Sequence, residues 1–337
     1  MNKIDKKLID ELARTRNLTF KTKQGYLNAL NCYVNFHEKS FISLLKEADY
    51  EEYEGIRWKD RKIKQRLIDF RIFLQEKYLI STVKVYFQRI ISLYNHFEIE
   101  IHKLPPISTK SCNISKPITF DDLPSKEHIK KAVEIASPIM KAIILFMSSS
   151  GCARRETLNL TIQDFVDATC EYHKEKDIKK ALLTLSRLDF IVPIFKIRRQ
   201  KTNRFYFTFC SPEASKEIIT YLLSNKELNG EDKLFDINLY YLNKNFNMIN
   251  DGLKLGKVGK YNKFRSHMLR KFHASSLYNA SNSLSFEEID SLQGRRKDST
   301  HSSYFMENPH ILKEKYIIVF LEKFIPYKLQ INIHGKK

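Results

Sequence analysis

Apolar side chains in the first hundred residues recur at the spacing of amphipathic helices. One stripe runs from Tyr26 to Val34 at intervals of three and four residues, and two more occupy residues 63–74 and 87–97. Each stripe needs a partner face to bury it. We therefore expect residues 1–105 to form a bundle of four or five helices, with the aromatic residues of the stripes in its core.

The pattern changes between residues 102 and 124, where four prolines stand among many Ser and Thr residues and no apolar stripe is present. This composition is typical of a linker. We place the linker at residues 106–117, between a first domain at 1–105 and a second at 118–337.

The second domain contains both helix signals and strand signals. Ser137-Pro138 is a start signal for a helix over residues 139–149, and a further helix should follow Gly151 through Leu160. Residues 190–198 and 204–210 are β-branched and aromatic, which predicts a hairpin.

Ser211-Pro212 starts the next helix, and the chain through Phe324 reads as helical with short breaks. The predicted fold class is mainly α (α+β), with a helical bundle followed by a mostly helical domain that contains a small antiparallel sheet.

The net charge indicates which class of partner the protein binds. The 337 residues include 58 Lys and Arg against 39 Asp and Glu, a net charge of +19, and Gly and Pro number only 9 each. Few glycines and prolines favour helices over a many-turned β fold. The positive charge points to a polyanion, with nucleic acid first and an anionic membrane surface second.

Several classes are disfavoured. The chain has no apolar run of about 18 residues and no secretory apolar core at its start. Its five cysteines are dispersed without a CxxC pair, which argues against a disulfide framework or a zinc site. No Walker loop or GxGxxG is present. We expect a cytoplasmic, nucleoid-associated protein without membrane contact, metal or cofactor.

Basic residues occur in both domains, since residues 1–117 carry 22 basic and 14 acidic residues. Such clusters are either solvated faces or phosphate contacts. The residues that we expect to contact double-stranded DNA are Lys62, Arg66, Arg198, Arg199 and Arg204.

Four separate segments of the second domain contain candidate catalytic groups. They are residues 148–165 with adjacent arginines at a helix start, the hairpin turn, residues 264–272, and residues 292–305. The candidates are Arg154 or Arg155, then Lys201, His267, Arg270 and Tyr304.

These residue types suit metal-free phosphoryl transfer. Two arginines can hold the two non-bridging oxygens of one phosphate. A hairpin lysine can protonate a leaving oxygen. A tyrosine hydroxyl has a pKa of about 10, and nearby arginines and an imidazole make its anion accessible as a nucleophile.

The combination resembles the tyrosine recombinases of the phage integrase family over nearly the whole chain. Gly151, Arg154 and Glu156 precede an apolar-Asn-Leu run, and residues 267–270 form a complete HxxR box. Tyr304 follows Gly294 by ten residues, as the family's nucleophile does. Within the family, the amino-acid sequence most resembles integrases of archaea and their viruses. This resemblance implies viral genome integration.

The resemblance implies a role for each domain and each residue. Residues 1–105 would be the core-binding domain and 118–337 the catalytic domain. Tyr304 would attack the scissile phosphate to form a 3′-phosphotyrosine, while Lys201 protonates the 5′ oxygen. His267 would take the tyrosine proton or hold the phosphate that Arg154 and Arg270 bind. The family implies a homo-tetramer on paired DNA sites, with the helix at 309–324 as a swap or docking element.

Two positions depart from the family pattern. The residue three before Glu156, usually arginine, is Ala153, and we favour Arg154 over Arg155 as the first catalytic arginine. The residue after Gly294 is Arg295 where the family has His or Trp. We assign Arg295 to phosphate binding, with His301 as the alternative.

Two other functions stay open. A type IB topoisomerase-like enzyme would nick and close DNA with the same residues and no paired sites. A non-catalytic DNA-binding regulator could share the fold, although the complete residue set speaks against it. A membrane-surface protein lacks the required amphipathic segment with an apolar face free for lipid.

Overall fold

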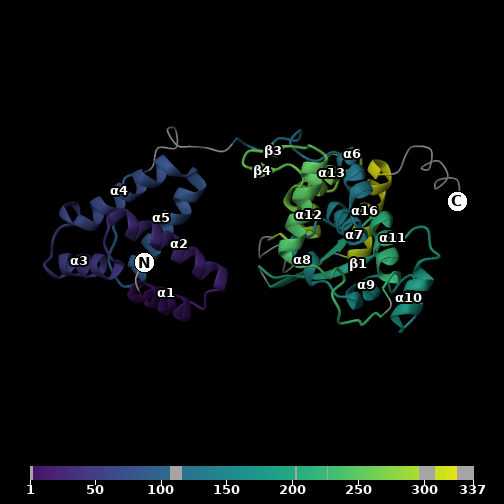
Figure 1. The fold of residues 1–337 in the computed structure, drawn as a ribbon, viewed down its shortest axis with the longest axis horizontal. Helices are drawn as coiled ribbons and strands as arrows, with labels where there is room; N and C mark the ends of the chain where they lie inside the picture. The colour runs from purple at the N-terminus through teal and green to yellow at the C-terminus, as the bar shows by residue number, and fades with distance from the viewer. Residues whose placement is uncertain (1–2, 107–115, 202, 226, 296–307, 325–337) are drawn as a thin grey trace. The chain divides into compact units, whose positions relative to one another are not determined.

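A computed structural model describes residues 3–106, 116–201, 203–225, 227–295 and 308–324, with side chains in the last segment through Val319. The chain divides into two compact units, residues 1–116 and 117–337 (Figure 1). Each unit has its own hydrophobic core. The mainly α fold with a small antiparallel sheet, predicted from the sequence, is confirmed.

Unit 1 is a helical bundle, as its apolar stripes predicted. Its elements are α1 (Lys3–Thr15), α2 (Phe20–His37), α3 (Phe41–Tyr53), a 3₁₀ turn (Trp58–Asp60), α4 (Lys62–Lys77) and α5 (Ile80–His96). The core is aromatic: Tyr33 packs edge-on against Phe70 with ring centroids 4.8 Å apart. Its hydroxyl shares a buried 3.1 Å hydrogen bond with that of Tyr94. These contacts join α2, α4 and α5.

Unit 2 is mostly helical. Its helices are α6 (Lys126–Ile135), α7 (Pro138–Ser150), α8 (Arg154–Asn159), α9 (Ile162–Ala168), α10 (Ile178–Leu185), α11 (Pro212–Leu223), α12 (Leu239–Gly252), α13 (Ser266–Tyr278), α14 (Phe286–Leu292) and α16 (Pro309–Phe324). Its strands are β1 (Ile194–Arg199), β2 (Arg204–Phe209), β3 (Lys257–Val258) and β4 (Tyr261–Asn262).

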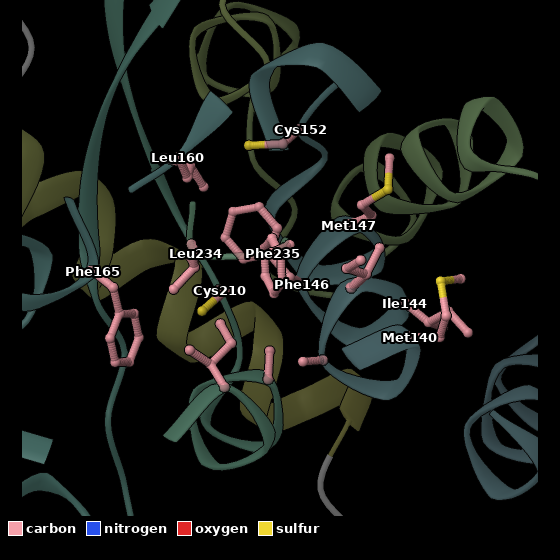
Figure 2. Close-up of a cluster of buried hydrophobic side chains, with 14 of the residues drawn as sticks. Met140, Ile144, Phe146, Met147, Cys152, Leu160, Phe165, Cys210, Leu234 and Phe235 are labelled. Atoms are coloured by element: carbon pink, nitrogen blue, oxygen red, sulfur yellow. The ribbon is translucent and has the colours of Figure 1, made fainter. Parts of the chain in front are cut away.

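Helix α7 is the centre of unit 2 and packs against α6, α11 and α13. Figure 2 shows Met140, Ile144, Phe146 and Met147 on this helix, with Phe235 beside them. All five side chains are buried. The predicted start signal is correct, because Pro138 occupies the first turn and Ser137 the cap position.

The β1–β2 hairpin is antiparallel, with Arg199 opposite Arg204 and Ile194 opposite Phe209. Its first strand begins four residues later than the apolar run at 190–198 suggested. The helices expected after residue 211, with short breaks between them, are present, and one of the breaks contains the short β3–β4 hairpin, which the sequence did not predict. There, Gly259 (φ +60°) opens a two-residue loop of the kind that joins hairpin strands.

Helix α16 packs on its own unit. The Tyr316 hydroxyl donates to the Ser149 carbonyl at 2.8 Å, and the Tyr316 ring lies 5.3 Å from that of Phe209. The described part of this helix thus closes the core over α7 and β2. Among the described residues, no helix is both long and apolar enough to cross a membrane.

Candidate active site

The site is built where α7 ends and α8 begins. Gly151 ends α7 in the left-handed region (φ +66°). A side chain there would collide with the imidazole of His273, 2.5 Å from the ideal Cβ position. Only glycine therefore allows α13 to approach this turn closely. The turn leads into α8, whose first residue is Arg154 and which packs against α12 and β1.

Arg270 is the buried cation of the site, with 8% of its surface exposed. Its guanidinium donates to the carbonyls of Gly151 and Gln293, each at 2.5 Å. It lies 3.8 Å from the Glu156 carboxylate. Burial lowers the pKa of Arg270 from its usual value, but an arginine stays protonated at neutral pH. Arg270 thus fixes three chain segments around one positive charge.

Glu156 supports both α8 and the hairpin. Its Oε2 accepts from the Ala153 amide at 3.0 Å, which caps α8, and from the Tyr206 hydroxyl at 2.9 Å. Glu156 thus caps α8 and orients the Tyr206 hydroxyl. The carboxylate also faces Arg270, so a single acid balances the buried charge.

His267 lies one helical turn before Arg270 on α13 and is exposed. Desolvation lowers the pKa of His267, and the charges of Lys271, Arg265, Arg270 and Arg154 lower it further. The imidazole is therefore neutral at pH 7 and able to accept a proton.

Arg154 is exposed at the N-terminus of α8 and donates to Asn243 Oδ1 on α12 at 2.7 Å. Arg155 is also exposed. Ala153, at the position of the usual arginine, is the N-cap residue of α8. Asn243 holds Arg154 in one direction, and no such contact is recorded for Arg155 among the described residues.

The C-terminal end of α14 completes the cluster. Arg199 of β1 donates to the carbonyls of Gln293, at 2.8 Å, and of Gly294. Gly294 (φ +58°) leaves room for the Tyr206 ring, which a Cβ would meet at 2.5 Å. Arg295 is exposed and pairs with Asp290 at 3.0 Å. The hairpin and the end of α14 are therefore fastened together.

The remaining candidates are placed as follows. Lys201 is exposed in the β1–β2 turn, two residues beyond Arg199. Arg204 is exposed, and Arg198 donates to Asn203 Oδ1 at 2.6 Å. Tyr304 and His301 lie outside the described residues. Arg199 and Arg270 both donate to the Gln293 carbonyl, and the charges of Arg154 and Arg270 act on His267.

In unit 1, Lys62 and Arg66 lie on α4 near Glu47. Lys62 is exposed, with its Nζ 3.8 Å from the carboxylate. Arg66 donates to both oxygens of Glu47, at 2.9 and 3.0 Å. Much of the Arg66 charge is therefore already balanced within the unit, whereas that of Lys62 is more available to a ligand.

Comparison with known proteins agrees with this architecture. No protein-family model and no curated protein matches the chain. The structure of the Tn1549 transposon integrase with transposon right end DNA matches with a TM-score of 0.52 and 11% identity, covering 96% of this chain and 99% of that one. The same integrase with circular intermediate DNA also gives 0.52 and 11%, over 93% and 98%. The chain has the same fold as this integrase.

Within the integrase fold, several supporting residues were not foreseen from the sequence. They are Asn243, which holds Arg154, and the buried residues Tyr206 and Gln293. The Gln293 amide donates to the Arg270 carbonyl at 3.0 Å and contacts His273 Nδ1 at 2.9 Å. No spacing signal links them, because their contacts join distant segments. Across the described residues, no group of three His, Cys, Asp or Glu is arranged to hold a metal ion.

His273 makes the integrase fold sensitive to acid. Burial, aided by the charges of Arg270 and Arg295, lowers the pKa of His273 to about 3. An unfolded histidine titrates near 6.5, so the unfolded chain binds a proton that the folded chain refuses. The contribution of His273 to stability is complete above pH 6.5 and falls by about 1.4 kcal/mol per pH unit below it.

We expect His273→Gln to reduce the loss of unfolding free energy between pH 6.5 and 4.5 by about 2–3 kcal/mol. Urea denaturation of both proteins at the two pH values measures this loss. The comparison uses each protein's own change with pH, so a general destabilisation by the substitution does not affect it. Equal losses in the two proteins would contradict the assignment.

Proposed function

We propose that this protein is a site-specific DNA recombinase that cleaves and rejoins strands through a 3′-phosphotyrosine at Tyr304. The observation that supports the proposal is that the charges of Arg154, on α8, and of Arg270, on α13, both act on His267. Three basic groups from two segments beside one turn make a site for a single phosphate. DNA in the complexes of the fold neighbours supports the choice of ligand.

In this mechanism, Arg154 and Arg270 bind the non-bridging oxygens, with Arg295 assisting. As the phenolic oxygen of Tyr304 forms its bond to phosphorus, His267, whose lowered pKa keeps it unprotonated beforehand, accepts the phenolic proton. The bond from phosphorus to the 5′ oxygen breaks, and Lys201 donates a proton to that oxygen. The 5′-hydroxyl of a partner strand then reverses these steps. Because the phosphotyrosine keeps the bond energy, no ATP is consumed.

Arg199 links the hairpin that carries Lys201 to the end of α14. It belongs to the strand that leads into the Lys201 turn, and it donates to the carbonyls at the end of α14. Tyr304 follows that end by ten residues. Arg199 therefore couples the position of the general acid to the segment of the nucleophile, and its direct contact with DNA stays a prediction, as do those of Lys62, Arg66, Arg198 and Arg204.

The test is a trapping assay on a labelled duplex with a nick just beyond the cleaved bond, so that the short leaving fragment diffuses away. We expect a covalent protein–DNA adduct in EDTA and without ATP. A duplex bound without any adduct would favour the non-catalytic regulator. Once an adduct is found, exchange between two sites indicates a recombinase. Relaxation of a one-site supercoiled plasmid without exchange indicates the topoisomerase-like alternative.

A further inference from the structure

The β3–β4 hairpin lies in an unusually acid-free part of the chain. No Asp or Glu occurs from Gly252 to Phe286, although the protein has 39 acidic residues in 337. The same stretch contains seven basic residues: Lys254, Lys257, Lys260, Lys263, Arg265, Arg270 and Lys271. Two of these, Arg270 and Lys271, belong to α13, and the other five precede it. In the folded chain one acidic side chain lies nearby, because the charges of Lys263 and Lys271 act on Asp122.

The hairpin presents its lysines to solvent. Lys257 pairs with Asn262 and Val258 with Tyr261 across the two strands. Lys254, Lys257 and Lys260 are exposed, and Lys263 donates from its Nζ to the Asp121 carbonyl at 3.0 Å. Figure 1 shows β3 and β4 at the edge of unit 2, next to α13. Three of the four lysines therefore have ammonium groups that a ligand can reach.

Lys254, Lys257 and Lys260 differ from many other basic residues, because among the described residues they form no ion pair with a carboxylate. Lys23 pairs with Asp10 at 2.7 Å and Lys315 with Glu288 at 2.5 Å. Within the described parts of the chain, none of the hairpin lysines forms an ion pair with a carboxylate. Their counterions come from solvent, and releasing such ions to bulk is what drives phosphate binding.

Side-chain contacts hold the hairpin next to the candidate active site. The Arg265 guanidinium lies 4.9 Å from the centre of the Tyr261 ring and donates to the Asn262 carbonyl at 2.6 Å. The Asn262 amide donates to Asn247 on α12 at 3.0 Å. Arg265 is two residues before His267 and contributes to its electrostatic surroundings. A phosphate backbone seated at His267 would therefore continue along the hairpin.

We propose that the β3–β4 hairpin binds the phosphate backbone of duplex DNA beside the cleaved bond, through Lys254, Lys257 and Lys260. This inference rests on the proposed function. It adds a DNA-contacting element that is not among the site residues predicted from the sequence. The contact is to phosphates, so it should contribute affinity without sequence preference.

The test compares two full-length triple variants with the same loss of charge. The first is Lys254→Gln, Lys257→Gln and Lys260→Gln. The matched control replaces three other lysines with Gln, namely Lys176, Lys179 and Lys180. They are exposed in and just before α10. In Figure 1, α10 lies at the other end of unit 2 from β3 and β4. All six side chains are exposed, so neither variant should disturb the core.

Fluorescence anisotropy with a labelled duplex across a range of salt concentrations gives the slope of log K against log salt. We expect the hairpin variant to lower the magnitude of this slope by about 2–3 and to weaken binding roughly 100-fold at 0.1 M salt. The control should change the slope by less than about 1. Equal changes in both variants, or no change in the hairpin variant, would overturn the inference while DNA binding by the native protein stands. Absence of DNA binding by the native protein would instead refute the proposed function.

Discussion

Replacing Tyr304 with Phe should reduce covalent adduct formation on a nicked duplex by more than about 10³-fold while leaving DNA affinity nearly unchanged. Phenylalanine keeps the ring but lacks the oxygen that forms the bond to phosphorus. Affinity is unaffected because it comes mainly from phosphate contacts made by basic residues elsewhere. Denaturing gels of labelled duplex after incubation measure the adduct, and anisotropy measures the affinity.

Tyr278→Phe provides the matched control. Tyr278 ends α13, is about half exposed, and stacks on Phe286 with ring centroids 4.6 Å apart. Removing its hydroxyl retains that stacking, so the adduct yield should equal that of the native protein. An adduct that persists in the Tyr304 variant, or disappears in the Tyr278 variant, would show that another residue is the nucleophile.

The helices of this fold could be predicted because their signals are local. The stripes of α2, α4 and α5 repeat at helical spacing, and Ser-Pro pairs begin α7 and α11. The β3–β4 hairpin gave no such signal, since strands of two residues are too short to show alternation. Its lysines are spaced three apart, which imitates a helix face. The positive φ of Gly259 that turns the chain becomes visible only in the structure.

In the candidate site, too, some residues have a local sequence signal and others do not. Arg154, His267 and Arg270 belong to short motifs that the sequence spacing predicts. In the structure, the charges of the two arginines act on His267. The groups that hold them come from distant segments, since Asn243 is 89 residues from Arg154 and Tyr206 is 50 from Glu156. Arg199 shows the limit most clearly. As one of several basic residues around a turn it appeared to be a surface contact, yet its guanidinium holds the end of α14.

Arg270 should be indispensable for both stability and cleavage, and two substitutions separate these effects. Arg270→Ala leaves the Gly151 and Gln293 carbonyls without their donors and Glu156 without its neighbouring charge. Such losses in a buried network typically cost about 3–5 kcal/mol of unfolding free energy. The cleavage rate should fall by about 10²–10³, because one donor to the phosphate is removed.

Arg270→Lys keeps the charge but replaces a planar fork with a single ammonium group. One ammonium cannot span two carbonyls in different segments and also meet a phosphate oxygen in fixed geometry. We therefore expect the lysine variant to recover part of the stability lost by the alanine variant, yet to cleave almost as slowly. Urea denaturation and single-turnover cleavage of a nicked duplex give the two quantities. Native-like cleavage by the lysine variant would show that charge alone suffices, and that the fork serves only to hold the α7–α8 turn against α14.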